Sequence, residues 1–246
     1  DPVTLRANAA ITHAAVAQAS TAGMNMLRIA GTMVYEEEHF FNACDELGML
    51  VWQDFMFANM DYPVDDPAFM ESVAVEVRQQ LRSIQSNPCL ALLCGNSEVE
   101  QQAAMWGASR EAWRSPLFDE TLAQLCAEHA PGVPYWPSSA HGGSFPHQAN
   151  EGTTSYYGVG AYLRPLHDAR LSNLRFATEC LAFANVPAPS TIERMPGGLA
   201  TRVHHPEWKA RSPRDLGAGW DFDDVRDHYL ESLFKTDPQQ LRYSHH

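Results

Sequence analysis

The stretch GMNMLRIAGTMVYEEEHFFNACDELGMLVWQDFMF, residues 23–57, decides the fold class of this chain. It opens with a short apolar run at 24–30, which we interpret as a strand. Residues 35–48 then set three acids before apolar residues at helical spacing, and Gly48 is a typical helix stop. Residues 49–57 are apolar at nearly every position, as expected of a strand buried on both faces. Strand, helix and strand in this order predict a βαβ unit with parallel strands.

The same alternation continues along the chain. Further helices are predicted at 11–23, 65–88, in a stretch reaching about residue 128, and at 221–235, and further strands at 89–95, 134–139, 153–161 and 174–180. The six strands begin about 30 residues apart, close to the pitch of an α/β (β/α)8 TIM barrel of about 250 residues. A doubly wound sheet is the alternative, although no GxGxxG or GxxxxGK loop follows any strand, which weakens a nucleotide-binding version.

The acidic composition bears on possible partners. The 246 residues carry 30 Asp and Glu against 17 Lys and Arg, a formal net charge of −13, and no basic cluster is visible. Such a surface repels nucleic acid and anionic lipid, so we expect neither nucleic acid nor a membrane as partner. No apolar run approaches the roughly 18–20 residues of a membrane span.

The cysteines and histidines point to no metal site or disulfide framework. The five cysteines are odd in number and form no CxxC pair, so we expect buried free thiols. Free cysteines and the lack of a visible signal peptide favour the cytoplasm as the location of the protein, and the periplasm is the alternative. The pairs His204-His205 and His245-His246 are interpreted as solvated loop residues, because adjacent histidines do not share a helix face and no HExxH occurs.

Two glutamates follow apolar strands, and in a barrel the carboxyl ends of the strands carry the functional groups. Glu98 follows CLALLCGNS and Glu179 follows LRFAT. A pair of carboxylates across a polar pocket suits glycoside hydrolysis, in which one acid protonates the leaving oxygen and the other attacks the anomeric carbon or activates water. The alternative is that both are structural acids in ion pairs, for instance with Arg28 or Arg175.

The motifs around these strands resemble those of the family-2 glycoside hydrolases, and of the β-mannosidases most closely. The resemblance rests on GMNMLRIAGTMVYEEEHFFNACDELGMLVWQDFMFANMDYP (23–63), LLCGNSE (92–98), PYWPSS (134–139) and RFATEC (175–180), and it covers about residues 11–190. It implies a TIM-barrel catalytic domain of which strands 2–7 are present, so that 1–246 is one partial domain, apparently a fragment, with 191–246 as an insertion-like loop and a C-terminal helix. Open barrel edges would then make an oligomer possible.

The resemblance also implies roles for individual residues. Glu98 becomes the general acid/base, with a raised pKa, and Glu179 the nucleophile, ionised and held near groups such as Arg28. Asn96 would orient the site, Asp61 would bind sugar hydroxyls, and Trp106 would form an apolar sugar platform. The substrate-binding candidates are Asn96, Ser97, Asp61, Trp106, Arg28, Tyr156 and Tyr157, with either tyrosine able to hydrogen-bond the nucleophile. The alternatives are a core or interface position for Trp106 and a plain loop position for Asp61, and Asp54 is expected to support the end of the barrel.

Four departures from the family pattern leave the sugar preference open. Ser97 stands where an Asn normally contacts the sugar 2-hydroxyl, Ala30 where Trp is usual, Cys180 where Phe is usual, and Ser155-Tyr156-Tyr157 where a His-Tyr-Trp-like run is usual. We therefore expect a retaining exo-β-glycosidase of β-mannosidase type, acting on an oligosaccharide or glycoside without metal or organic cofactor. The alternatives are β-glucuronidase, β-galactosidase or exo-glucosaminidase activity, and a non-catalytic carbohydrate-binding remnant.

Overall fold

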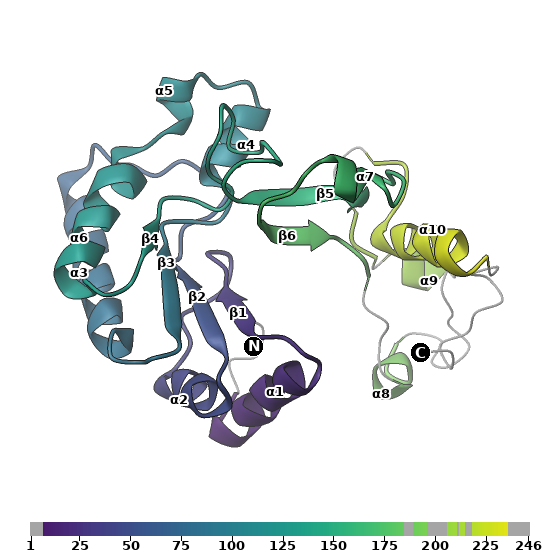
Figure 1. Cartoon of the computed structure of the whole chain (residues 1–246), viewed down its shortest axis with the longest axis horizontal. Coiled ribbons are helices and arrows are strands. Elements are labelled where there is room, and N and C mark those ends of the chain that lie inside the picture. The colour runs from purple at the N-terminus through teal and green to yellow at the C-terminus, as the bar shows by residue number, and fades with distance from the viewer. Residues whose placement is uncertain (1–6, 185–188, 196–205, 211, 215–217, 236–246) are drawn as a thin grey trace. The chain divides into compact units, whose positions relative to one another are not determined.

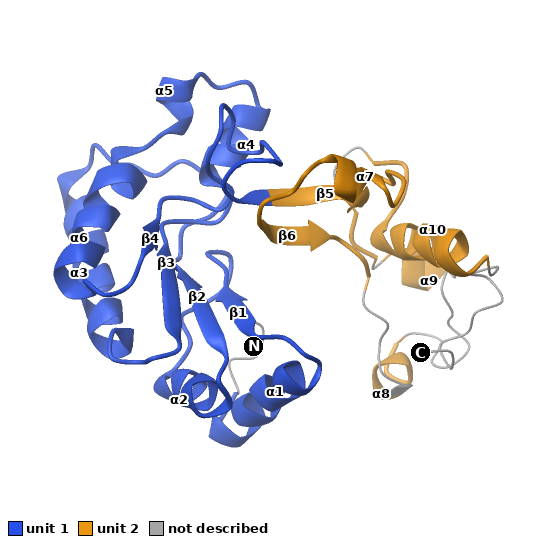
Figure 2. Ribbon diagram, in the orientation of Figure 1, with its two compact units in different colours: residues 1–154 blue, residues 155–246 orange. Residues whose placement is uncertain are grey.

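The protein consists of two compact units, residues 1–154 and residues 155–246 (Figure 2). The computed structural model describes residues 7–184, 189–195, 206–210, 212–214 and 218–235. The four histidines of the two predicted solvated pairs lie outside the described residues. Each unit is described by itself.

Unit 1 is built on a four-stranded parallel sheet. Its strands are β1 (Met26–Ile29), β2 (Leu50–Asp54), β3 (Leu90–Cys94) and β4 (Tyr135–Trp136). All four were predicted, and their spatial order β1-β2-β3-β4 follows the chain. A doubly wound sheet reverses its strand order at a switch point, whereas a (β/α) barrel adds each strand beside the last. The uninterrupted order therefore favours the barrel type over the doubly wound alternative.

The helices α1 (Ala9–Thr21), α2 (Glu38–Leu47), α3 (Pro67–Ile84) and α6 (Leu122–His129) lie along one side of this sheet (Figure 1). Helix α3 begins at Pro67, where the Asp66 side chain accepts a hydrogen bond from Ala68 N and Pro67 occupies the first turn. Helix α2 ends at Gly48, whose φ of 69° is the left-handed cap conformation that glycine adopts readily.

The predicted helical stretch up to residue 128 is divided into several pieces. These are α4 (Val99–Met105), α5 (Arg110–Trp113), the π-helical turn η1 (Leu117–Thr121) and α6. Gly107, with a φ of 89°, follows the end of α4, and Pro116 precedes η1. Because a left-handed residue cannot continue an α-helix, α4 stays short and the chain turns sharply after it.

One hydrophobic core lies between the sheet and these helices. Residues of β2 and β3 meet the apolar stripe of α3, and the fully or nearly fully buried members include Val51, Val73, Val77, Leu81, Ile84, Leu93, Phe41, Phe118 and Leu122. The helical spacing of residues 73, 77, 81 and 84 places these side chains on one face of α3. The core fixes the strand ends from which the site is built.

Unit 2 is smaller and contains the other two predicted strands. Strands β5 (Thr154–Gly160) and β6 (Ala177–Leu181) form a two-stranded sheet of their own. The helices are α7 (Asp168–Leu171), α8 (Pro189–Ile192), α9 (Pro206–Lys209) and α10 (Phe222–Phe234). Helix α10 confirms the helix predicted at 221–235, and its Asp221 forms a capping box.

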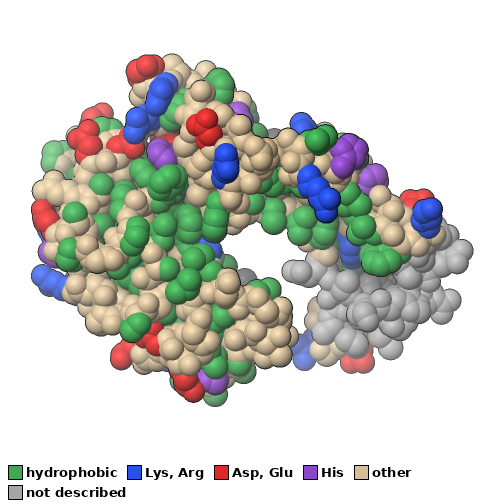
Figure 3. Space-filling view, viewed as in Figure 1, with side chains coloured by type: hydrophobic (Ala, Val, Ile, Leu, Met, Phe, Trp, Pro, Cys, Tyr) green, Lys and Arg blue, Asp and Glu red, His purple; other side chains and the backbone are tan. Residues whose placement is uncertain are grey.

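The cysteine prediction holds for four residues and is wrong for one. Cys44, Cys89, Cys94 and Cys126 are buried free thiols, whereas Cys180 is free and exposed because it lies near the end of β6 in a small sheet. Among the described residues, no helix combines the length and apolarity needed to cross a bilayer. On the face drawn in Figure 3, Lys and Arg side chains lie singly among acidic and uncharged ones.

Candidate active site

The carboxyl ends of β2, β3 and β4 continue as a short ladder that positions Glu98. Ser97 forms parallel bridges with Ala58 on one side and Ser139 on the other. Glu98 N then donates to Ser139 O at 2.5 Å, so the main chain at Glu98 is held by the segment that follows β4. Gly95 allows the segment after β3 to lie close to the segment after β4, because a Cβ at position 95 would lie 2.2 Å from Pro137 O.

Glu98 itself lies at the turn from this ladder into α4. Its φ of 62° and ψ of 13° place a non-glycine residue in the left-handed region. Such conformations cost about 1–3 kcal/mol and cluster at functional sites, so the observation motivates a functional role. The half-buried carboxylate accepts hydrogen bonds from Gln101 Nε2 at 3.1 Å and Gln102 Nε2 at 3.2 Å. Both oxygens are therefore oriented by side chains of the first turn of α4.

Asn96 is fully buried and fixes the backbone on which Glu98 sits. Its Oδ1 accepts from Val99 N at 3.0 Å and from Ser138 Oγ at 2.7 Å. Its Nδ2 donates to Pro137 O at 3.1 Å. The side chain thus joins the start of α4 to the segment after β4. This placement supports the orienting role expected of Asn96 and leaves no exposed surface for a sugar.

Arg28 binds Asp54 at the ends of β1 and β2. Arg28 Nη2 lies 2.7 Å from Asp54 Oδ2 and Arg28 Nε lies 3.4 Å from Oδ1. Asp54 is fully buried and also accepts from Gly31 N at 3.0 Å and Trp52 Nε1 at 2.8 Å. Burial raises the pKa of Asp54, while the Arg28 guanidinium and the hydrogen-bond donors oppose that shift. These contacts fit the supporting role predicted for Asp54.

Arg28 also reaches Ser97. Its Nη2 donates to Ser97 Oγ at 3.2 Å, and Ser97 is 2% exposed. The serine that replaces the family asparagine therefore directs its hydroxyl to the ion pair. Arg28 belongs to unit 1 and Glu179 to unit 2, so the expected proximity of these two side chains stays a prediction.

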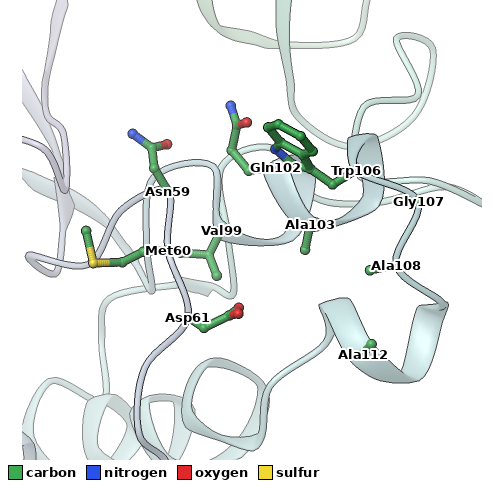
Figure 4. A pocket seen from close by; sticks show the side chains of 10 residues that line it. All are labelled: Asn59, Met60, Asp61, Val99, Gln102, Ala103, Trp106, Gly107, Ala108 and Ala112. Carbon is green, nitrogen blue, oxygen red and sulfur yellow. The ribbon is translucent and has the colours of Figure 1, made fainter.

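A groove of about 510 Å³ runs beside α4 and contains two of the predicted sugar contacts (Figure 4). The loop at 59–61 contributes Asp61, which is exposed, and the end of α4 contributes Trp106, which is 85% exposed. Gln102, which also binds the Glu98 carboxylate, lines the same groove. The exposure of Trp106 excludes the alternative that it is a core residue. A carboxylate and an exposed indole in one groove can supply hydrogen-bond acceptors and an apolar face.

The second glutamate lies in unit 2, on β6. Tyr157 on β5 donates its hydroxyl to Glu179 Oε2 at 2.5 Å. Tyr156 instead donates to Asp168 Oδ2 at 2.5 Å, because neighbouring residues of a strand point to opposite faces. Of the two tyrosines proposed as partners of Glu179, the structure thus selects Tyr157. Burial and the hydrogen bond to Asp168 raise the pKa of Tyr156.

One polar pair was not predicted from the sequence. Glu100 is 1% exposed, and its Oε2 lies 2.9 Å from His141 Nδ1. The pair joins α4 to the loop after β4, 41 residues further along the chain. An acidic residue two positions after Glu98 looked like part of a solvated helix start, and no local pattern marks His141 as its partner. Among the described residues, no group of three or more His, Cys, Asp or Glu side chains could hold a metal ion.

Comparison with known proteins places these motifs in a family. No family model matches the chain. Beta-mannosidase B of Thermothelomyces thermophilus is 34% identical over 148 residues, which cover 54% of this chain and 17% of that protein. Beta-mannosidase of Rattus norvegicus is 49% identical over 79 residues, which cover 32% of this chain and 9% of that protein. The crystal structure of a beta-D-mannosidase from Dictyoglomus thermophilum aligns with a TM-score of 0.71 and 32% identity, over 77% of this chain and 23% of that one. Over the aligned residues, the chain is similar to β-mannosidases, so we describe it as a β-mannosidase-like domain.

The more distant structures support the fold of this β-mannosidase-like domain alone. An exo-chitosanase from Amycolatopsis orientalis aligns over 94% of the domain with a TM-score of 0.61 and 16% identity. The parallel strands that alternate with helices therefore match part of the TIM barrel of this family, as the resemblance implied. The domain spans less than a quarter of the length of the β-mannosidases compared above.

Proposed function

We propose that the β-mannosidase-like domain carries the catalytic residues of a retaining exo-β-glycosidase that removes terminal β-linked mannose. The observation that carries this proposal is the arrangement at Glu98. A carboxylate at the end of a parallel strand, in a left-handed turn and fixed by two glutamine amides, is positioned beside a groove with an exposed indole. The relatives are named β-mannosidases, and the motifs LLCGNSE (92–98) and RFATEC (175–180), which contain Glu98 and Glu179, resemble those of the β-mannosidases.

In the first step, the Glu179 carboxylate attacks the anomeric carbon as the bond to the leaving oxygen breaks. Glu98 gives its proton to that oxygen, so the aglycone departs as a neutral alcohol and Glu98 becomes a carboxylate. The mannosyl group is left on Glu179 as an ester. The Tyr157 hydroxyl, which donates to Glu179 Oε2, orients the nucleophile.

In the second step, water attacks the anomeric carbon of the ester. Glu98 takes a proton from the water, and the bond to Glu179 breaks to release mannose with retained configuration. Both glutamates return to their starting protonation states. The amide donors of Gln101 and Gln102 support Glu98 when it is ionised, because amide N–H groups stabilise a carboxylate.

Substrate recognition is assigned to the groove beside α4. Trp106 offers its indole face to the apolar side of a sugar ring, and Asp61 accepts hydrogen bonds from sugar hydroxyls. Gln102 links the two functions, because it lines the groove and also donates to the Glu98 carboxylate. An oligosaccharide or glycoside is the implied partner.

The test is the hydrolysis of 4-nitrophenyl β-mannoside in a panel with the matching glucoside, galactoside, glucuronide and glucosaminide. We expect the mannoside to have the highest kcat/KM, and Glu98→Ala and Glu179→Gln each to lose most of it. The matched control is Glu71→Gln, an exposed glutamate on α3. Azide should restore turnover of Glu98→Ala and yield β-mannosyl azide, because a small anion needs no proton transfer from a base. Retained activity in Glu98→Ala and in Glu179→Gln would overturn the assignment.

A second candidate is carbohydrate binding without turnover. It is favoured by Ser97, whose buried hydroxyl accepts from Arg28 where the family has an asparagine for the sugar 2-hydroxyl. The same panel separates the two candidates. Saturable mannoside binding, measured by calorimetry, with no release of 4-nitrophenol from any substrate would favour the binding function.

A further inference from the structure

A second pocket, of about 220 Å³, lies next to α4 and shares no lining residue with the groove described above. The residues that line it include Glu100, Arg110, Trp113, Arg114, His141 and Gly143. It is below the range of about 300–1,000 Å³ that is typical for drug-sized ligands, so it suits a smaller molecule. The mechanism proposed above uses none of these side chains.

The pocket contains a buried carboxylate with one oxygen that lacks a hydrogen bond. Glu100 is 1% exposed, and its Oε2 is bound to His141 Nδ1. Its Oε1 is buried and has no hydrogen-bond partner among the residues that the structure describes. An unsatisfied buried oxygen costs about 1–3 kcal/mol or more, so a bound donor would stabilise this site. The terminal torsion of a glutamate is broad, so a modest rotation turns Oε1 towards the pocket.

Two arginines also line the pocket. Arg110 is exposed and forms no ion pair with any described residue, and its guanidinium lies 6.0 Å from the centre of the Trp113 ring. Arg114 is bound by Asp119 through two hydrogen bonds of 3.0 and 2.9 Å. Arg110 is therefore the guanidinium with free capacity, and a planar fork of this kind matches a carboxylate.

We propose that this pocket binds a small hydroxylated carboxylate. The ligand carboxylate pairs with Arg110, and a ligand hydroxyl donates to Glu100. A hydroxyl fits better than an ammonium group as the donor, because two guanidinium groups line the same pocket and would repel a third cation. This inference is independent of the proposed glycosidase function, since it concerns other residues and another pocket.

The experiment is an NMR titration of the ¹⁵N-labelled chain with D-glycerate. Glycerol has the hydroxyls without the carboxylate, propionate has the carboxylate without the hydroxyls, and 3-aminopropanoate replaces the hydroxyls by an ammonium group. We expect D-glycerate to shift the amide signals of Gly142 and Gly143 saturably, and to bind at least tenfold more tightly than the other three compounds.

Two variants locate the binding. Arg110→Gln changes an exposed side chain and should weaken D-glycerate at least tenfold, because a charge-assisted hydrogen bond is lost. Arg82→Gln, an exposed arginine on α3, is the matched control and should leave the affinity unchanged. Glu100→Gln should bring D-glycerate down to the affinity of propionate, and if this variant does not fold, Arg110→Gln decides alone.

Three results would overturn the proposal. They are the absence of saturable shifts at Gly142 and Gly143, an affinity for D-glycerate that Arg110→Gln leaves unchanged, and binding of propionate or 3-aminopropanoate as tight as that of D-glycerate. Because none of these readouts uses glycoside hydrolysis, they separate this proposal from the proposed function.

Discussion

Removal of Arg28 tests whether its ion pair with Asp54 holds the strand ends together. Arg28→Met keeps the apolar stem but leaves the carboxylate of Asp54, which is fully buried, with two donors, Gly31 N and Trp52 Nε1. Removing one partner of a buried ion pair costs about 3–5 kcal/mol because it leaves an uncompensated charge. We expect a loss of that size in the free energy of unfolding, measured by urea denaturation with tryptophan fluorescence at neutral pH.

The pH dependence of this loss follows from the protonation of Asp54. Burial already raises the pKa of Asp54 in the intact protein, and without Arg28 it rises further. A protonated carboxyl is neutral and needs no cation, so below the folded pKa the variant and the intact protein should differ least. As pH rises through the raised pKa, the carboxylate must ionise without a partner and the deficit should grow. Unfolding at about pH 4 and about pH 7 would show this trend.

A double variant makes the argument refutable. Arg28→Met combined with Asp54→Asn has no buried charge left, so it should be more stable than Arg28→Met alone. Arg82→Met is the matched control, and we expect a change within about 0.5 kcal/mol for this exposed position. The reasoning fails if Arg28→Met lies within about 1 kcal/mol of the intact protein at neutral pH, or if the two substitutions are simply additive.

Three further perturbations have defined outcomes. Leu81→Ala, at a position with 0% exposure in the core, should lower the free energy of unfolding by about 2–5 kcal/mol in urea denaturation. Gly48→Ala should cost about 1 kcal/mol in the same assay, because φ is 69° and no atom lies within 4 Å of the new Cβ, so the cost is conformational alone. Tyr157→Phe should lower kcat for the aryl mannoside about 10-fold to 100-fold with little change in unfolding, because it removes the hydroxyl that orients Glu179.

Each of these has its own control. Val75→Ala, on the same helix but 43% exposed, should change the unfolding free energy far less than Leu81→Ala. Gly132→Ala also meets open space but has no positive φ, so equal losses at Gly132 and Gly48 would contradict the conformational argument. Unchanged kcat in Tyr157→Phe would remove Tyr157 from the mechanism.

Much of the fold of unit 1 could be predicted from local patterns. The strands at 26–29, 50–54 and 90–94 lie within the predicted apolar runs, since parallel strands covered on both faces are apolar throughout. The stop at Gly48 was equally predictable, because a helix cap acts on the neighbouring backbone. These features depend only on residues close in the sequence.

The candidate site was predictable in its motifs and not in its contacts. Glu98 and Glu179 stood out because an acid at the end of an apolar strand is unusual. The choice of Tyr157 over Tyr156 depended on which face of β5 turns towards Glu179, and a register of one residue decides that. Cys180 was expected to be buried and is exposed, because sequence context does not reveal how little covers the end of β6.

The sequence alone determined the order of strands and helices, the helix stop at Gly48, and the glutamate that follows β3, because periodicity and capping act over a few residues. Only the tertiary structure decided that Arg28 neutralises Asp54, that Asn96 joins α4 to the segment after β4, and that Glu100 meets His141. These pairs are 26 to 42 residues apart along the chain. Their partners are set by the register of neighbouring strands and the packing of α4, which no local pattern encodes.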